Sequence, residues 1–157
     1  MTDSYTIRRA NLADEAAILA LLPDLADFDV PPKRNPDDLW QSDAALASKV
    51  LRGTADQSVL FVADDGTGKV LGLTLTTFRP DLMSGAPSAH LEAIVVSSAA
   101  RGLGLGRALL GHCEAMVREQ GAASLSLHVF NNNVRARTLY AAEGFDLELI
   151  RATKWLD

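Results

Sequence analysis

Apolar residues in the first third of the chain recur at the three- to four-residue spacing of a helix. The repeating positions are Ala16, Leu19, Leu22 and Ala26. Asn11 precedes them and belongs to the residue types that cap helix N-termini. Asn35-Pro36 has the same signature, a capping residue followed by proline at the first helical position, and predicts a second helix that ends near Gly53. Residues 5–9, ahead of both helices, are expected to form a short strand.

Short apolar runs rich in β-branched residues fill the middle of the chain. Residues 59–63 and 70–78 are separated by a turn of aspartates and glycines, so they predict an antiparallel hairpin. Residues 79–88 contain two prolines and a glycine and are expected to form a loop. Residues 91–96 then predict a third strand of the same sheet.

The last third of the chain alternates helical and extended patterns. A glycine-rich segment enters a helix that runs to about Gln120, on whose apolar face Cys113 is expected to pack as a core residue. A strand over 125–130, a helix over 134–143 and a final strand over 145–155 follow. The order β-α-α-β-β-β-α-β-α-β predicts an α/β (α+β mixed sheet) domain over residues 1–157, with helices on both faces of the sheet.

Composition narrows the class of protein. The chain has 157 residues with 48% apolar and 22% charged side chains, which is typical of a globular domain. Its net charge of −5 argues against non-specific nucleic-acid binding. A single cysteine and three histidines without zinc-site spacing predict no metal. No signal-peptide layout or membrane-length apolar run occurs, so a cytoplasmic location is expected.

The segment from Arg101 to Arg107 has the strongest chemical signal. It follows an apolar strand, contains three glycines and opens a helix. Glycines leave backbone N–H groups accessible, and the helix N-terminus adds a positive partial charge, a combination that suits a diphosphate. Arg101 and Arg107 are candidates for additional phosphate contacts. The alternative is a tight strand-to-helix turn without a ligand.

Three nucleotide-binding motifs compete for this segment. A Rossmann fingerprint requires G-x-G-x-x-G after the first strand, whereas here Gly104 and Gly106 are followed by Leu109 and lie late in the chain. A P-loop requires Gly-Lys-Ser/Thr, which is absent. Arg101, Gly104 and Gly106 fit the R/Q-x-x-G-x-G/A loop of the GCN5-related N-acetyltransferase (GNAT) superfamily, which the segment resembles.

A second motif strengthens this resemblance. Asn133-x-x-Ala136-x-x-x-Tyr140, followed by Gly144-Phe145, is similar to a later GNAT motif and stands at the expected distance from the glycine loop. The resemblance implies the GNAT fold and acetyl-CoA as co-substrate, with the thioester in a gap between two splayed strands. The residues it assigns to the cofactor are Ile94, Val95, Val96, Arg101, Gly102, Leu103, Gly104, Leu105, Gly106, Arg107, Asn133 and Tyr140.

The resemblance also implies catalytic roles. Tyr140 corresponds to the general acid near the sulfur, and the backbone N–H of Val95 to an oxyanion donor. Glu92 is the best candidate for the general base, with an ion pair to a nearby arginine or lysine as the alternative. Strand alternation places its side chain on the same face as His90 and Ile94. His90 is an alternative base by residue type, although its place at a strand start favours a solvated role. Asn133 either contacts the cofactor or caps the last helix.

The sequence contains only weak signals for the acceptor substrate. An acidic and aromatic rim, formed by Asp24, Asp27, Phe28 and Asp29, suits a cationic amine, but a solvated acidic loop is the alternative. Phe78 and loop 79–88 are candidates for the opposite wall. His128 is expected to be a hydrogen-bonded histidine at a strand end, with a place facing the gap as the alternative. The prediction is therefore an N-acetyltransferase acting on a small primary amine. A non-catalytic acetyl-CoA sensor or scaffold, a protein N-acetyltransferase and an unrelated mononucleotide-binding protein are the alternatives, and the protein is a candidate homodimer.

Overall fold

A computed structural model describes residues 4–156. Along the chain, its helices and strands are β1 (Thr6–Arg9), α1 (Glu15–Leu21), α2 (Gln41–Leu51), β2 (Ser58–Asp64), β3 (Val70–Pro80), β4 (Pro87–Val96), α3 (Leu105–Glu119), β5 (Leu125–Leu127) and α4 (Val134–Ala142). Short 3-10 turns occupy Leu12–Asp14, Leu22–Ala26, Pro36–Leu39 and Ser98–Ala100.

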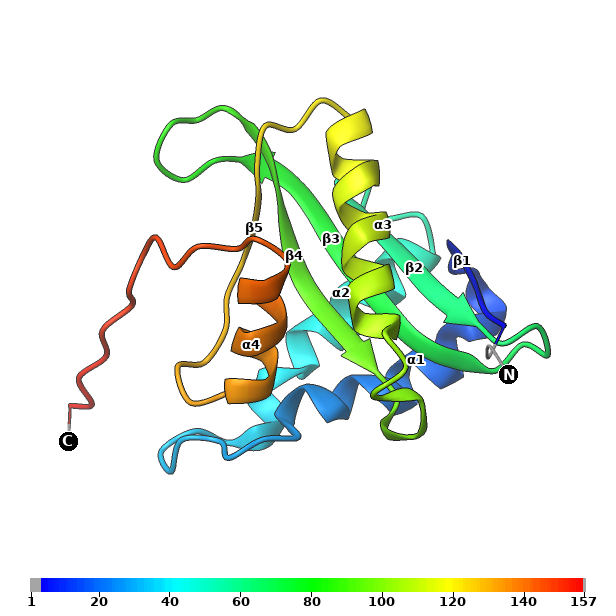
Figure 1. The fold of residues 1–157 in the computed structure, drawn as a ribbon, viewed down its shortest axis with the longest axis horizontal. Helices are drawn as coiled ribbons and strands as arrows, with labels where there is room; N and C mark the ends of the chain where they lie inside the picture. Colours follow the sequence, from blue (N-terminus) through cyan, green and yellow to red (C-terminus); the bar gives the residue numbers. More distant parts are fainter. Residues whose placement is uncertain (1–3, 157) are drawn as a thin grey trace.

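The strands form one five-stranded sheet in the order β1-β2-β3-β4-β5. The first three pairings are antiparallel, and β4 pairs with β5 in parallel. In Figure 1, α3 lies in front of the sheet with α4 beside it, while α1 and α2 lie behind. The predicted mixed sheet with helices on both faces is confirmed.

Local sequence signals set the helix starts. The Asn11 side chain accepts a hydrogen bond from the Ala13 N–H, and the Asp14 carboxylate accepts one from the Asn11 N–H, which completes a capping box. Asn35 caps the turn that leads into α2, with Pro36 at its first position. Both predicted caps are confirmed.

Each face of the sheet has its own apolar cluster. Behind the sheet, Ile18 and Leu22 pack with Ala47 of α2 against β2, β3 and β4. In front, the side chains of α3 pack on the same strands, and Cys113 is fully buried there with its Sγ 3.2 Å from Thr76 Oγ1. The prediction that Cys113 is a core residue is confirmed.

A β-bulge interrupts the pairing of β3 with β4. Leu75 is paired with Ala93 but Thr76 with Leu91, so Glu92 is the extra residue on β4. The bulge reverses the alternation of the strand: Leu91 belongs to the cluster in front of the sheet, whereas Ala93 belongs to the one behind it. Because a strand otherwise alternates faces strictly, this one residue changes where every later side chain points.

The final strand of the prediction is wrong. Residues 146–156 form no strand within the described chain, and several apolar side chains of this segment are exposed, among them Leu147, Leu149 and Ile150. Their alternation with Asp146 and Glu148 indicates a strand, but strand structure also requires a neighbour that supplies hydrogen bonds. β5 ends at Leu127, short of the predicted residue 130.

Candidate active site

β4 and β5 separate where the candidate site begins. Their pairing is limited to three residue pairs and ends at Leu91–Leu127. Beyond this point the edge of β4 from Glu92 to Val96 has no described strand beside it, although its other edge remains paired with β3. The split leaves backbone N–H and C=O groups of Ile94, Val95 and Val96 without a β5 partner, as the predicted cofactor role requires.

The glycines of the loop before α3 serve two different purposes. Gly102 and Gly104 have φ values of +82° and +78°, a left-handed conformation that favours glycine. Gly106 has no positive φ, but a Cβ on it would approach Leu139 Cδ2 of α4 to 3.2 Å. The first two glycines therefore shape the loop, and the third allows α4 to pack against the start of α3.

The loop aims the N-terminus of a 15-residue helix at the open end of the split. Gly104 caps this helix without a side-chain hydrogen bond, so the first backbone N–H groups of α3 are available to an anion. Leu105 is only 2% exposed, whereas Leu103 is exposed. Of these two predicted cofactor residues, Leu105 can therefore offer only its backbone.

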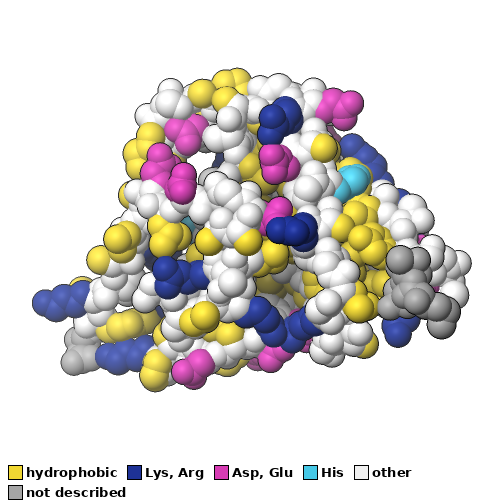
Figure 2. Space-filling model, in the orientation of Figure 1, with side chains coloured by type: hydrophobic (Ala, Val, Ile, Leu, Met, Phe, Trp, Pro, Cys, Tyr) yellow, Lys and Arg dark blue, Asp and Glu magenta, His cyan; other side chains and the backbone are white. Residues whose placement is uncertain are grey.

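Both arginines of the loop are paired with carboxylates. Arg101 Nη1 donates to Asp27 Oδ2 at 2.7 Å, and its Nε donates to the Val96 carbonyl at 3.3 Å. Arg107 is paired with Glu143, which follows α4. Figure 2 shows basic side chains at the lower centre of this face, where α3 begins, with acidic ones next to them. A bound phosphate would compete with these carboxylates for the guanidinium groups.

Tyr140 lies on α4, on the α3 side of the split. Its ring packs edge-on against Phe145 at 5.8 Å and joins the cluster that includes Ile94 and Leu139. Burial raises the pKa of the Tyr140 hydroxyl to about 12, so the hydroxyl keeps its proton at neutral pH. Asn133 caps α4 through the Ala136 N–H at 3.3 Å, which confirms the capping alternative for its side chain.

Glu92 lies on the other side of the split. Its carboxylate is half-buried and lies 3.8 Å from Arg79 Nη1 of β3, and it acts on Asp43 of α2 through its charge. The prediction that it shares a face with Ile94 is wrong, because Ile94 packs in front of the sheet with α3. The bulge at Glu92 causes this difference. Glu92 and Tyr140 therefore flank the split from opposite faces of the sheet.

His90 is not the solvated residue that its position predicts. It is 4% exposed, its Nδ1 lies 2.8 Å from Ser126 Oγ, and its ring lies 4.6 Å from that of His128. Desolvation, with smaller effects from Arg79 and His128, lowers the pKa of His90 to about 4. The imidazole is therefore neutral at pH 7 and is a much weaker base than an ordinary histidine.

Asp43 is the residue that sequence reasoning missed. It lies in the first turn of α2, and burial together with the charge of Glu92 raises its pKa to about 7. Within residues 4–156 its carboxylate makes no hydrogen bond or ion pair. The signal in the sequence is slight: Asp43 stands one helical turn before the buried Ala47, and so on the sheet-facing side of α2.

The predicted acidic rim contacts the segment between β5 and α4. Phe28 and Phe130 stack with ring centroids 5.4 Å apart, and the Asp29 carbonyl accepts a hydrogen bond from the Asn132 side chain. Arg135 donates to the Asp27 carbonyl at 3.4 Å. These contacts bring residues 27–29 to the α4 side of the loop before α3.

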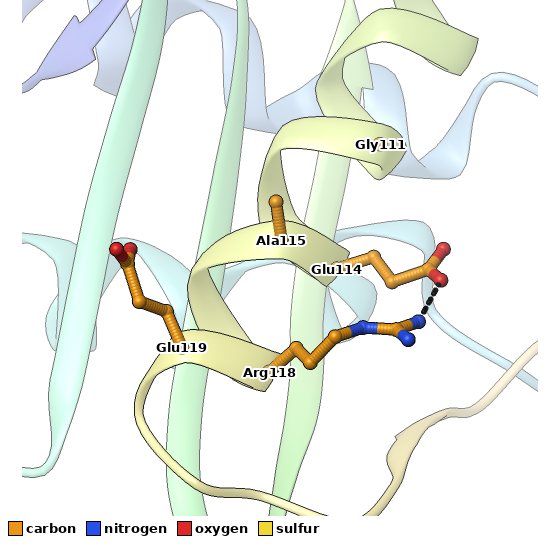
Figure 3. A pocket seen from close by; sticks show the side chains of 5 residues that line it. All are labelled: Gly111, Glu114, Ala115, Arg118 and Glu119. Atoms are coloured by element: carbon orange, nitrogen blue, oxygen red, sulfur yellow. Dashed lines mark hydrogen bonds and ion pairs between the residues drawn. The ribbon is translucent and has the colours of Figure 1, made fainter.

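Two hollows on the surface lie away from this arrangement. One lies on the outer face of α3, where Glu114 and Arg118 form an ion pair across one helical turn (Figure 3). The other lies between the end of α3 and Phe145. Neither includes Glu92, Asp43 or the glycine loop. Both are lined mainly by small and charged side chains, and neither has the predominantly aromatic and large apolar walls that are typical of ligand pockets, although Phe145 lines the second.

The mixed sheet splits next to a glycine-rich helix N-terminus, an arrangement that suits a ligand with a diphosphate group. A model of the acetyltransferase (GNAT) family matches residues 20–145, and the chain belongs to this family. The fold agrees: the aminoglycoside N-acetyltransferase AAC(6')-Iy in complex with CoA superimposes with a TM-score of 0.73 at 21% identity, over 98% of this chain and 95% of that one.

Curated relatives differ in what they acetylate. Aminoglycoside N(6')-acetyltransferase type 1 of Stenotrophomonas maltophilia is 30% identical over 90% of this chain and 86% of its own length. The N-terminal acetyltransferase A complex catalytic subunit ard1 of Schizosaccharomyces pombe is 33% identical over 62% of this chain and 56% of its own length. The chain spans between 29% and 56% of the length of three of the relatives that it matches.

Two further findings concern the described part of the chain. Among residues 4–156, no helix is both long and apolar enough to cross a membrane. The same residues contain no group of three histidine, cysteine, aspartate or glutamate side chains arranged to hold a metal ion.

Proposed function

We propose that this acetyltransferase is an acetyl-CoA-dependent N-acetyltransferase that moves the acetyl group directly to a primary amine of a small molecule. The split between β4 and β5 carries the proposal, because it opens at Glu92, beside the glycine loop, and Tyr140 flanks it from α4. The family match over residues 20–145 and the fold of a CoA-bound neighbour support it. We propose one domain over the whole chain, with a cytoplasmic location.

The residues around the split fit the parts of acetyl-CoA. Left-handed Gly102 and Gly104 and the N-terminus of α3 suit a diphosphate, with Arg101 and Arg107 beside them. The free edge of β4 suits an arm that carries amide groups, because such an arm can pair with backbone N–H and C=O groups as a strand does. When bound, acetyl-CoA supplies a thioester whose acetyl carbon the amine nitrogen attacks.

Three groups of the chain serve this reaction. Glu92 takes a proton from the amine, directly or through a water molecule. The Val95 N–H donates a hydrogen bond to the oxyanion that develops on the acetyl carbon. Tyr140 keeps its proton until the carbon–sulfur bond breaks and then donates it to the departing sulfur, a role for which the raised pKa keeps the hydroxyl protonated.

A small-molecule acceptor is favoured because a relative that matches 90% of this chain is named for an aminoglycoside. The similarity to a protein N-terminal acetyltransferase covers less of the chain. A protein N-terminus is the second candidate acceptor. We propose a homodimer as the assembly. A monomer mass by light scattering at the assay concentration would contradict the assembly without affecting the enzymatic proposal.

Thermal unfolding with acetyl-CoA, ATP and NAD tests the cofactor first. A ligand at about 100 times its dissociation constant stabilises the folded state by about 2.7 kcal/mol, which raises the melting temperature by several degrees. A shift with acetyl-CoA alone is expected. Release of free CoA thiol is then measured with a polyamine, an aminoglycoside and a peptide with a free N-terminus. A thermal shift without thiol release from any amine would favour the sensor or scaffold, and no thermal shift would overturn the proposal.

A further inference from the structure

We propose that Asp43 and Glu92 together bind the acceptor as an ammonium ion, and that Asp43 takes the proton which the ammonium loses before transfer. The inference rests on the proposed function, because it assigns the acceptor side of the same site. It also narrows the acceptor class to amines that are cationic at neutral pH. Amides and weakly basic aromatic amines are thereby excluded as preferred acceptors.

The helix that carries Asp43 fixes its side chain against the sheet. Ala47, one turn later, is 1% exposed and packs in the cluster behind the sheet together with Ala93. Residues four apart share one face of a helix, so Asp43 lies on the sheet side of α2 as well. Ala93 follows Glu92 directly on β4. Asp43 therefore lies one helical turn from Ala47, which packs in the same cluster as Ala93, the residue next to Glu92.

Strand alternation supplies the second half of the geometry. Ala89 and Leu91 belong to the cluster in front of the sheet, so the side chain of Glu92 points to the opposite face, where α2 lies (Figure 1). There its carboxylate lies 3.8 Å from Arg79 Nη1, and its charge acts on Asp43. The bulge changes the direction only of the residues after Glu92. The two carboxylates therefore approach the open edge of β4 from two elements that are far apart in sequence.

The surroundings of the two carboxylates differ. Glu92 has Arg79 Nη1 at 3.8 Å, which compensates part of its charge, whereas Asp43 has no ion pair or hydrogen bond within residues 4–156. Two nearby negative charges in a partly desolvated site attract a cation and resist being ionised together. A single ammonium group between them removes this repulsion, which a neutral acceptor does not.

The proton balance is simple. The ammonium R–NH₃⁺ gives one proton to the Asp43 carboxylate and becomes R–NH₂, whose lone pair forms the new bond to the acetyl carbon. The proton released from nitrogen in the addition step goes to Glu92 or to a water molecule beside it. A carboxyl group with a pKa of about 7 is matched to this exchange at neutral pH.

The charged groups around Asp43 lie on several elements. From β4, Glu92 raises its pKa, and His90 on the same strand is neutral at pH 7. From β3, Arg79 is directed to Glu92. From α1, Glu15 is paired with Arg52 just past the other end of α2. Glu92 is therefore the charged group, among those described, whose charge acts on the pKa of Asp43.

The test compares Asp43→Asn with the matched control Asp38→Asn, which removes the same charge from the exposed turn before α2. Both variants are first checked for the acetyl-CoA thermal shift, which reports the proposed function alone. Carboxyl ¹³C NMR of the CoA-bound proteins is then titrated with n-butylammonium chloride. We expect saturable shifts of Asp43 and Glu92 in the parent protein, and a roughly tenfold weaker response of Glu92 in Asp43→Asn.

The proton role is tested with the amine of the panel that is acetylated fastest. In the parent protein, kcat/KM should fall as the pH drops through about 7, because Asp43 must be ionised. In Asp43→Asn, the fall of kcat/KM at acidic pH should disappear, and kcat/KM should be about 10²-fold lower than in the parent protein. Asp38→Asn should keep the parent's kcat/KM and its pH dependence. The assignment would be overturned if Asp43→Asn bound n-butylammonium as the parent protein does, or if its kcat/KM still fell at acidic pH. Absence of the acetyl-CoA shift in the parent would overturn the proposed function instead.

Discussion

The Arg101 guanidinium of the glycine loop donates to the Asp27 carboxylate at 2.7 Å, across 74 residues of sequence. The pair joins the loop before α3 to the segment between the first two helices. The guanidinium lowers the pKa of the Asp27 carboxyl, with a smaller effect from Arg135, so Asp27 remains ionised well into acidic pH. An anion that binds Arg101 at neutral pH must therefore compete with a full negative charge.

Neutralising Asp27 is expected to favour the cofactor. Asp27→Asn should tighten CoA binding a few-fold, and the gain should shrink as salt is added, because exposed charges are screened. Isothermal titration at two ionic strengths measures this. Glu119→Gln removes the same charge at the far end of α3 and serves as the control. Weaker binding by Asp27→Asn would show that the carboxylate instead holds Arg101 in the geometry that the phosphate needs.

The left-handed backbone of the loop gives a second prediction. Gly104→Ala forces a Cβ into a φ of +78°, at a cost of about 1–2 kcal/mol, although no atom lies within 4 Å of that Cβ. Gly85→Ala in the loop between β3 and β4 has the same problem at φ +71°. Both variants should lose similar stability in urea, but only Gly104→Ala should also weaken CoA binding. Equal CoA affinity in the two variants would show that the loop before α3 does not bind the cofactor.

Patterns that depend on neighbouring residues were predictable from the sequence. Asn11 and Asn35 act as caps through atoms two or three residues away, so their roles are visible locally. The glycine loop and the helix after it are likewise encoded within one short segment. The same holds for the apolar face of α3 that buries Cys113.

Features that depend on distant pairing were not predictable. The bulge at Glu92 arises from the register of β4 against β3, and no local pattern marks it. The raised pKa of Asp43 comes first from burial against the sheet and second from the charge of Glu92, 49 positions away by the numbering. The alternation in residues 145–155 predicts a strand, but the structure forms none over residues 146–156. Pattern alone does not supply a partner.

Tyr140 provides a test of the acid role. Tyr140→Phe removes the hydroxyl but keeps the ring against Phe145, so folding and CoA affinity should change little. If the hydroxyl protonates the departing sulfur, kcat should fall about 10²-fold. Steady-state rates of thiol release measure this, with Tyr5→Phe as the control for loss of a phenol elsewhere. Full activity in Tyr140→Phe would make the residue a packed aromatic.

Asp43 should lower the stability of the protein in a pH-dependent way. Its pKa rises from an ordinary value of 3.8 to about 7 on folding, because burial and Glu92 disfavour the charged form. The folded state thus binds the proton more tightly than the unfolded chain, and this contribution to stability is complete below about pH 4 and is lost as the pH rises through about 7. Asparagine has no such charge to desolvate.

Asp43→Asn should therefore be more stable than the parent protein by roughly 1–3 kcal/mol at pH 8, a range that allows for partial exposure of the side chain. The difference should shrink toward pH 4, where both side chains are neutral in the folded state. Urea unfolding at the two pH values measures it, and Asp38→Asn should show no comparable change because its side chain is exposed. A gain that is equal at both pH values would indicate a packing effect of asparagine. A gain confined to high pH would show that the folded protein keeps a desolvated carboxylate at a cost in stability, which is common at functional sites.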